Sequence, residues 1–349
     1  MKKVEVGILG ATGIVGQRLI SLIENHPWFQ VTWVAASERS AGKKYTDGCS
    51  WRLHEPLPER IGKLFINHCN PSGAPQLIFS SLDSNVAGEV ETEFANAGHV
   101  VVSNSGNHRM NSDIPLIIPE INSDHLSLIK IQKRNRGWKG AIITNPNCTT
   151  IFLAMSLAPL DKNFGLKKIL MTSMQAVSGA GYPGVPALDI LGNVIPYIPR
   201  EEEKVEAETK KILAEVSDDS AIEGDWVISA QCNRVMVENG HTEAISVALK
   251  TRPTRDDLIA AWQEYRSVPQ ERKLPSAPPH PIIVREELDR PQPKLDAYTE
   301  GGMATVIGRV RSCPVLEFKY VALGHNTIRG AAGASLLNAE LIRSEGYLD

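Results

Sequence analysis

The chain has 349 residues, 42% of them hydrophobic and 22% charged, with a formal net charge of -3. A chain of this length usually forms more than one hydrophobic core, so we expect two domains with room for a cleft between them. The charge balance offers no overall attraction to nucleic acid, and an anionic ligand would therefore need a local cluster of cations. No stretch approaches the length of a membrane span and no secretory segment opens the chain, so we expect a cytoplasmic protein.

The cysteines are odd in number and widely scattered. No CxxC pair occurs, so the sequence suggests neither a disulfide framework nor a zinc site, and we expect reduced thiols and no bound metal. The five are Cys49, Cys69, Cys148, Cys232 and Cys313.

The first part of the chain alternates short apolar runs with longer stretches. Residues 4–9 form an apolar run, a glycine-rich turn follows, and residues 15–23 have the apolar spacing of a helix. Further buried strands are predicted at residues 31–36, 77–79, 99–103 and 141–143. This rhythm is typical of a parallel, doubly wound sheet, and it predicts an α/β, Rossmann-like dinucleotide-binding domain over residues 1–147.

The turn after the first strand has the sequence GILGATGIVG, residues 7–16. Its glycines would let the backbone approach a pyrophosphate, and the N-terminus of the following helix would attract the negative charge. The alternative is that the glycines serve tight packing alone. The predicted dinucleotide contacts are Gly10, Thr12, Gly13, Ile14 and Val15.

The second strand ends in Ser37-Glu38-Arg39-Ser40. Hydroxyls and a cation at this position suit the 2′-phosphate of NADP, so Ser37, Arg39 and Ser40 are predicted to bind it. Glu38 is the contrary feature, because an acidic residue here could bind the ribose of NAD instead. Arg39 could also belong to a solvated loop.

A second motif, TNPNCTT at residues 144–150, lies between a predicted strand and the helix-compatible residues 151–160. A cysteine at a helix N-terminus has its thiolate stabilised by the helix dipole, and the free backbone amides there can receive an oxyanion. Cys148 is therefore the predicted nucleophile. Cys69 and Cys313 are predicted to be inert thiols, and Cys232 lies in mid-strand.

Beyond Cys148 the chain changes to long alternating segments. These lie at residues 167–177, 226–237, 242–250, 305–310 and 316–323. They predict a second, α+β domain over residues 148–325 with a mostly antiparallel sheet. The proline-rich residues 268–293 are predicted to form an ordered loop or arm with room for a role in oligomer contacts.

The segment CNRVMVENGH, residues 232–241, places Arg234 near the end of one predicted strand and His241 at the start of the next. A hairpin would bring the two side chains together. Histidine titrates near neutrality and can exchange a thiol proton, and arginine binds a carboxylate with two parallel hydrogen bonds. His241 is thus a candidate base and Arg234 a candidate substrate anchor, although a lone histidine is more often structural.

Five motifs in the same order, GATGIVGQ, TNPNCTT, QAVSGAGYPG, CNRVMVENGH and NTIRGAAGAS, give the chain its resemblance to a known family. The chain resembles aspartate-semialdehyde dehydrogenase of the archaeal and fungal-like branch over nearly its whole length. The resemblance implies an NADP-dependent, reversible reduction of L-4-aspartyl phosphate to L-aspartate 4-semialdehyde with release of phosphate. This step serves the biosynthesis of lysine, threonine, methionine and isoleucine.

The resemblance also implies roles for individual residues. Cys148 would be the nucleophile, His241 the acid/base and Gln175 the residue that positions the thioester. The substrate-binding residues would be Arg109, Glu201, Lys204 and Arg234, with Glu202 and Glu203 as alternatives to Glu201. Further cofactor contacts would be Ser81, Ser178, Gly179 and Asn326. Met236 stands where the family usually has proline.

At the level of the whole chain, the resemblance implies that residues 148–325 form a catalytic and dimerisation domain. It also implies that a C-terminal helix, residues 326–349, returns to the first domain. The expected assembly is a homodimer or homotetramer.

Three alternatives stay open at the level of sequence. Malonyl-CoA reductase resembles the same branch and shares the cysteine, the histidine and the cofactor, but Asn145 and Asn147 favour an aspartyl substrate. N-acetylglutamyl-phosphate reductase has a different sequence around its nucleophile. A non-catalytic NADP-binding protein is the third alternative, and loss of Cys148 or His241 would have been its sign.

Overall fold

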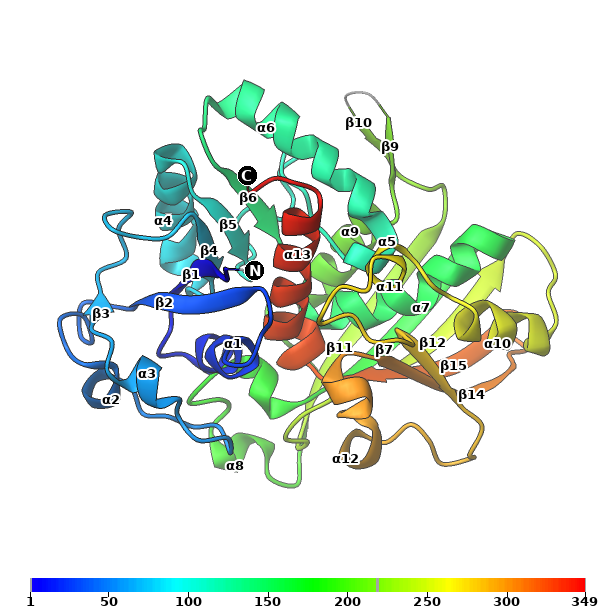
Figure 1. Cartoon of the computed structure of the whole chain (residues 1–349). Helices are drawn as coiled ribbons and strands as arrows, with labels where there is room; N and C mark the ends of the chain where they lie inside the picture. The colour runs from blue at the N-terminus through cyan, green and yellow to red at the C-terminus, as the bar shows by residue number, and fades with distance from the viewer. Residues whose placement is uncertain (1, 218–219, 349) are drawn as a thin grey trace.

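The apolar runs of the first half form a six-stranded parallel sheet in the computed structural model, which describes residues 2–217 and 220–348 (Figure 1). The strand order is β3-β2-β1-β4-β5-β6, as a doubly wound fold requires. Its strands are β1 (Val4–Leu9), β2 (Phe29–Ala35), β3 (Ile66–Asn67), β4 (Leu77–Ser80), β5 (Val100–Ser103) and β6 (Ala141–Thr144). The expected Rossmann-like architecture is confirmed.

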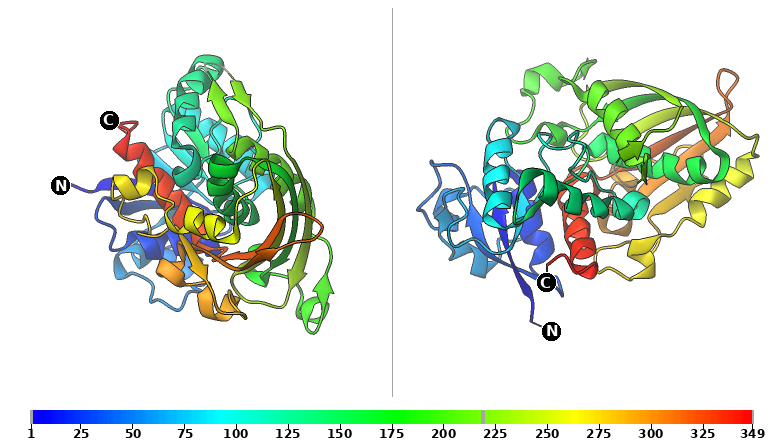
Figure 2. Two further views of the ribbon diagram at one scale, coloured as in Figure 1. Left: turned by 90° about the vertical axis from the view of Figure 1, so that its right-hand side faces the viewer. Right: turned by 90° about the horizontal axis from the view of Figure 1, so that it is seen from above.

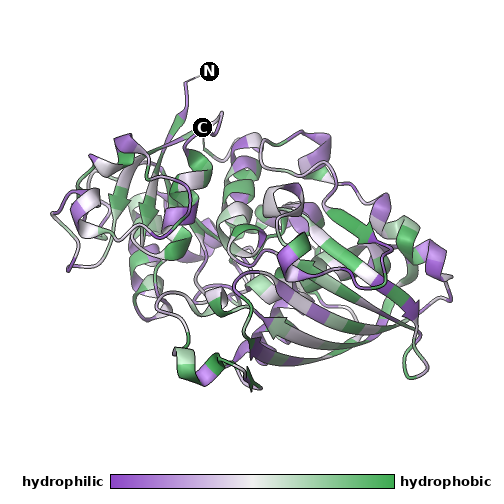
Figure 3. Cartoon of the chain, turned by 90° about the horizontal axis from the view of Figure 1, so that it is seen from below, coloured by the Kyte–Doolittle hydropathy of each residue, from purple (hydrophilic) through white to green (hydrophobic). Residues whose placement is uncertain are grey.

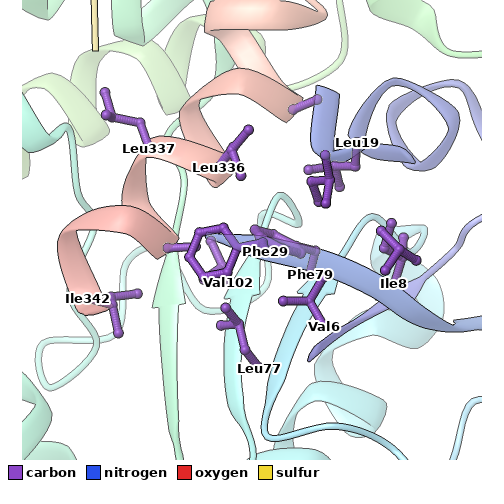
Figure 4. Close-up of a cluster of buried hydrophobic side chains, with 14 of the residues drawn as sticks. Val6, Ile8, Leu19, Phe29, Leu77, Phe79, Val102, Leu336, Leu337 and Ile342 are labelled. Atoms are coloured by element: carbon purple, nitrogen blue, oxygen red, sulfur yellow. The ribbon is translucent and has the colours of Figure 1, made fainter. Parts of the chain in front are cut away.

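Helices from both ends of the chain cover one face of this sheet. Helix α1 (Ile14–Ile23) and helix α13 (Gly333–Ser344) pack side by side over the strands, and α13 follows the short turn η4 (Ile328–Ala332) (Figure 4). Leu336 and Leu337 of α13 share a buried cluster with Phe29 and Phe79 of the sheet. The C-terminal segment therefore contributes to the core of the first half.

The opposite face of the sheet packs against α4 (Ser84–Ala97) through a separate buried cluster that includes Trp33 and Phe94. The remaining helices of the first half are α2 (Tyr45–Gly48), α3 (Glu59–Gly62), α4 (Ser84–Ala97), α5 (Pro119–Asn122), η1 (Ser123–Ser127) and α6 (Leu128–Arg136).

The second half contains a seven-stranded sheet in the order β13-β14-β15-β12-β7-β11-β8. Its strands are β7 (Leu166–Gln175), β8 (Val194–Ile195), β11 (Val227–Val235), β12 (His241–Leu249), β13 (Ile282–Arg285), β14 (Thr305–Ser312) and β15 (Phe318–Gly324). The sheet is mixed, so the prediction of a mostly antiparallel sheet is only partly confirmed. The pairs β7–β11 and β13–β14 are parallel because helical connections carry the chain back to the same end of the sheet before each second strand.

The predicted hairpin between the strands that carry Arg234 and His241 is wrong. β7 lies between β11 and β12 and pairs with both, so the short turn after β11 crosses over one strand. Arg234 lies opposite Gln175 in this register. β7 and β11 nevertheless end where β12 begins, which places Arg234, Gln175 and His241 together at one end of these strands.

Helix α7 (Cys148–Phe164) joins the two halves and is buried from Thr149 to Leu160. It packs against β7, β12, β14 and β15 on one side and against α9 (Glu201–Ile212) and α10 (Arg255–Gln263) on others. A Cβ atom at Gly324 would lie 2.0 Å from the Phe152 ring, so the strand needs glycine to approach the helix. Figure 2 shows the long helices of this half on one side of the curved sheet.

Several short elements complete the second half. The proline-rich residues 268–293 are more regular than predicted, because they contain a helical turn and the edge strand β13. The short elements are η2 (Val177–Ala180), α8 (Ala187–Ile190), α11 (Val268–Glu271), α12 (Pro293–Asp296), η3 (Thr299–Gly302) and the ribbon of β9 (Glu215–Ser217) with β10 (Ser220–Ile222). Within residues 2–217 and 220–348, no helix has the length and apolar character needed to cross a membrane.

A carboxyl group lies inside the second half without a partner. Glu243 on β12 is fully buried, and neither of its carboxyl oxygens has a hydrogen-bond partner among the described residues. Burial raises the pKa of Glu243 well above its ordinary value, because an ionised carboxylate is costly in an apolar interior. The folded protein therefore holds this group in its neutral form.

We expect Glu243→Gln to stabilise the protein above pH 5. The unfolded carboxyl ionises near pH 4.3, while the folded one stays protonated, so native Glu243 lowers the free energy of unfolding as pH rises between the two pKa values by about 1.4 kcal/mol per pH unit. Denaturant unfolding at pH 8 should show a higher free energy of unfolding for the variant than for the native protein. The gain should vanish near pH 4, and a difference that does not change with pH would contradict this account.

Candidate active site

A cavity of about 1060 Å³ runs between the two halves, from the glycine-rich turn to Cys148. It gathers most of the residues predicted to bind a dinucleotide or to react. Predicted residues along its wall are Gly10, Thr12, Gly13, Ile14, Val15, Ser37, Arg39, Ser81, Arg109, Cys148, Ser178, Gly179 and Asn326. Ser40 is not among the lining residues, and its hydroxyl donates a hydrogen bond to the Gly48 carbonyl at 3.1 Å.

The glycines of the turn divide into two kinds. A Cβ atom on Gly10, which has a φ of +72°, would lie 2.5 Å from the Ser81 carbonyl oxygen, and one on Gly16 would lie 2.5 Å from that of Gly10. Both glycines are therefore required by packing. Gly13 is the N-cap of α1, and glycine has no side chain that could accept the first backbone amides of the helix. These amides are therefore free to bind an anion.

The far end of the cavity is lined by Ser37, Glu38 and Arg39. The Glu38 carboxylate is exposed and lies 2.9 Å from His68 Nδ1. The hydroxyl and the guanidinium beside it are the groups that suit a phosphate on the ribose.

Two further residues of the cavity escaped the sequence analysis. The Arg52 guanidinium lies 3.6 Å from the centre of the Tyr182 ring, and both residues line the cavity. They belong to different halves of the chain, and no local pattern predicts that they meet.

Cys148 and His241 are in direct contact. The Cys148 Sγ atom lies 3.2 Å from His241 Nε2, and the Ala176 amide donates a hydrogen bond of 3.1 Å to Nδ1 of the same ring. Because Nδ1 accepts that bond, the neutral ring carries its hydrogen on Nε2, which faces the sulfur. The backbone of residue 176 thus sets the orientation of the histidine.

Arg234 and Gln175 lie beside this pair. The Arg234 Nη1 atom donates to the Ala176 carbonyl at 2.8 Å, and Gln175 donates to the Ser173 hydroxyl at 3.2 Å. A Cβ atom on Gly179 would lie 2.8 Å from Arg234 Nη1 and 3.0 Å from the His241 ring. Only glycine lets this loop close over the two side chains.

Asn147 caps the N-terminus of α7 and thereby fixes the position of Cys148, the first residue of the helix. The Asn147 Oδ1 atom accepts the amides of Thr149 and Thr150, and its Nδ2 donates to Glu201 at 2.8 Å. Asn145 is equally engaged, with Asn104, Ser335 and the Ala331 carbonyl. Both side chains therefore hold the catalytic loop in place.

Helix α9 presents Glu201 to the site. The neighbouring Glu202 and Glu206 instead accept the backbone amides of Cys232 and Ala230. The Lys204 ammonium lies 3.9 Å from Glu201 and is partly exposed. Among the alternatives left open by the sequence, Glu201 is the glutamate in contact with the catalytic loop.

Arg109 is buried in the wall of the cavity and is not a solvent-exposed cation on a surface loop. It donates to Glu208 at 3.0 Å and to the Asn104 carbonyl at 2.7 Å. Glu208 was missed by the sequence analysis, although its spacing of seven residues from Glu201 places both on one face of α9.

The electrostatics of the site oppose ionisation at rest. Burial, followed by the nearby Glu201 carboxylate, raises the pKa of Cys148 to about 12, while Arg234 and Arg109 act in the opposite direction. Burial, Arg234 and His325 lower the pKa of His241 well below its ordinary value. The resting pair is therefore a neutral thiol beside a neutral imidazole.

Within the described ranges, 2–217 and 220–348, no group of three or more His, Cys, Asp or Glu side chains could hold a metal ion. All five cysteines are free.

Comparison with known proteins gives consistent matches over both halves. Residues 5–129 match the family model of the semialdehyde dehydrogenase NAD binding domain, and residues 157–329 match that of the semialdehyde dehydrogenase dimerisation domain. Aspartate-semialdehyde dehydrogenase of Archaeoglobus fulgidus is 48% identical, over 97% of this chain and 98% of that protein. The Schizosaccharomyces pombe protein of that name is 45% identical, over 99% of each.

Among solved structures, aspartate-semialdehyde dehydrogenase with NADP from Candida albicans superimposes with a TM-score of 0.91. It has 41% sequence identity and covers 98% of this chain and 99% of that one.

We expect Glu201→Gln and Arg234→Gln to move the pKa of Cys148 in opposite directions. Removing the carboxylate lowers the pKa, and removing the guanidinium raises it. The rate of Cys148 alkylation by iodoacetamide, followed against pH, measures both changes. Glu203→Gln is the matched control, since Glu203 is exposed on the same helix and should leave the profile unchanged. Shifts of equal sign in the two variants would contradict this interpretation.

Proposed function

The chain belongs to the aspartate-semialdehyde dehydrogenase family, and we propose that it performs the family reaction through a thioester on Cys148. It is an NADP-dependent enzyme that reversibly converts L-4-aspartyl phosphate to L-aspartate 4-semialdehyde in amino-acid biosynthesis. The proposal is carried by one observation, the 3.2 Å contact between Cys148 Sγ and His241 Nε2 at the inner end of a dinucleotide-sized cavity. Malonyl-CoA reductase and a non-catalytic binder are not favoured, because relatives that are 48% and 45% identical over nearly the full chain are named aspartate-semialdehyde dehydrogenase.

The cavity fits NADP by its own chemistry. The uncapped first turn of α1 offers free amides to the pyrophosphate, and Ser37 with Arg39 suits the 2′-phosphate. Ser178 and Asn326, which are hydrogen-bonded to each other at 2.8 Å, line the cavity near Cys148 and would hold the nicotinamide end. When bound, the cofactor supplies or accepts a hydride.

Cys148 provides the covalent step. Its thiolate attacks the acyl phosphate carbon, the C–O bond to phosphate breaks, and a thioester remains, while the proton lost from Sγ ends on the released phosphate. The His241 Nε2–H donates to the oxygen that becomes negative, because Asn147 Oδ1 already accepts the amides of Thr149 and Thr150 at the start of α7. Once hydride has reached the thioester carbon, the thiohemiacetal on Cys148 collapses to the aldehyde, with His241 as the acid/base beside the departing sulfur.

The charged residues around the thiol each bind a different group of the substrate. Arg234 binds the amino-acid carboxylate, Glu201 the amine, and Arg109 with Lys204 the phosphate, while Gln175 orients the acyl group. A substrate ammonium on Glu201 would offset the negative charge that raises the pKa of Cys148. Substrate binding thereby favours the thiolate at the moment it is needed.

The proposal also assigns a division of the chain. Residues 1–147, together with residues 326–349, bind the cofactor, and residues 148–325 carry catalysis and dimerisation. The packing of α13 onto the first sheet supports the return of the C-terminal segment.

Residues 157–329 match a dimerisation domain, which supports self-association through the second half. The second sheet supports this, because hydrophilic and hydrophobic residues alternate along its strands (Figure 3) and alternate residues of β7 and β11 are exposed on the open face. Leu170 and Met174 of β7 and Val227 of β11 are 48%, 38% and 55% exposed there. Several exposed apolar side chains on one face of a sheet are best covered by a second copy of the chain. This gives a homodimer or, by pairing of dimers, a homotetramer.

Phosphate-dependent reduction of NADP by aspartate semialdehyde tests the catalytic proposal. We expect activity in the native enzyme and its loss, by about 10⁴-fold or more, in Cys148→Ala, because no other group supplies the nucleophile. Cys313→Ala, which changes a thiol far along the chain on the β14–β15 loop, should retain activity. Substantial turnover by the Cys148 variant would sink the proposal.

Leu170→Arg tests the assembly. A charge on the open face should be buried without a partner in the dimer, so the variant should dissociate to monomers in analytical ultracentrifugation at micromolar concentration. Val315→Arg is the control, because Val315 is 79% exposed on a loop away from this face. An unchanged sedimentation coefficient for Leu170→Arg would place the interface elsewhere.

A further inference from the structure

Helix α9 buries three charged side chains on the face that it turns toward the site. These are Glu201, Glu208 and Lys211, each less than 9% exposed. Their spacing of seven and three residues puts them on one side of the helix. Buried charges are tolerated only when they are paired and hydrogen-bonded, so the partners of each one show what the helix holds in place.

Both carboxylate oxygens of Glu208 accept hydrogen bonds from residues of the proposed active site. One accepts the Arg109 Nη1–H at 3.0 Å, and the other accepts the backbone amide of Asn147 at 2.6 Å. Asn147 immediately precedes Cys148 and caps the helix that carries it. One carboxylate therefore joins the proposed phosphate-binding arginine to the start of the nucleophile's helix.

Lys211 fixes the same arginine through the backbone. Its ammonium donates to the carbonyls of Arg109, Asn111 and Ile114 at 2.6, 2.7 and 2.8 Å. These three bonds use all the donors of the ammonium group. The segment that carries Arg109 is thus tied to α9 one helical turn beyond Glu208.

We infer that Glu208 is a positioning residue for the phosphate half of the reaction, holding the Arg109 guanidinium at a fixed place relative to Cys148. The inference rests on the proposed role of Arg109. With Nη1 bound to Glu208 and Nη2 bound to the Asn104 carbonyl, only the buried Nε of Arg109 has no partner among the described residues. A guanidinium held in this way loses little conformational freedom when phosphate binds.

The test variant is Glu208→Gln, which keeps the shape of the side chain but cannot accept both hydrogen bonds. We expect the KM for phosphate in the semialdehyde-oxidising direction to rise about tenfold or more, with a smaller fall in kcat. The same rise should appear in the phosphate concentration that protects Cys148 from alkylation, which needs no turnover. The dissociation constant for NADP should stay unchanged.

Glu206→Gln is the matched control. Glu206 lies on the same helix and accepts a backbone amide, that of Ala230 at 2.9 Å, but contacts neither Arg109 nor Asn147. An equal rise in both variants would mean that loss of a helix anchor is the cause, and the inference would be wrong. Should Glu208→Gln fail to fold, Glu208→Asp keeps the charge but is too short to span both partners, and it should raise the same two phosphate constants.

Arg109→Gln and the double variant Arg109→Gln, Glu208→Gln separate this inference from the proposed function. If Glu208 acts through Arg109, the double variant binds phosphate no more weakly than Arg109→Gln alone. Additive losses would overturn the inference, as would unchanged phosphate constants in Glu208→Gln alongside raised ones in Arg109→Gln. Unchanged phosphate constants in Arg109→Gln would show instead that the proposed phosphate site itself is wrong.

Discussion

Helix α7 is apolar around its whole circumference, and the chain must therefore cover it on every side. The second sheet, α9, α10 and the C-terminal segment do so, which leaves the N-terminus of the helix at the carboxyl edge of the first sheet. Ligands bind at that edge in doubly wound folds. Because Cys148 is the first residue of α7, the packing of one helix brings the nucleophile to the cofactor cavity.

The same burial sets the electrostatic problem that the enzyme has to solve. Raising the pKa of the Cys148 thiol from 9.0 to about 12 corresponds to about 4 kcal/mol against the thiolate. This rise already includes the lowering of the pKa by Arg234, Arg109 and the Thr149 backbone amide at the helix N-terminus, so these groups together do not overcome desolvation. Arg234 and Arg109 assist, and a substrate that brings an ammonium to Glu201 would remove an opposing charge. This arrangement keeps the thiol protonated until a substrate is present.

Local patterns predicted much of this correctly, and long-range relations account for what they missed. The strands of the first half, the turn after β1 and the cysteine at a helix start are encoded within a few neighbouring residues. The insertion of β7 between β11 and β12 depends on pairing across about 60 residues, and no hydrophobic alternation specifies it. The contact of Glu208 with Arg109, and that of Arg52 with Tyr182, likewise join distant segments. The carboxyl of Glu243 has no hydrogen-bond partner among residues 2–217 and 220–348, so no pairing pattern in the sequence could have indicated it.

A single-turnover experiment without phosphate would detect a covalent intermediate on Cys148. The enzyme is mixed with aspartate semialdehyde and NADP, and the NADPH formed is compared with the acyl group found on each cysteine peptide by mass spectrometry. We expect about one NADPH per active site, an acyl adduct confined to the peptide with Cys148, and continued turnover only after phosphate is added. Steady NADPH formation without phosphate, or no adduct on Cys148 after the burst, would contradict the proposed intermediate.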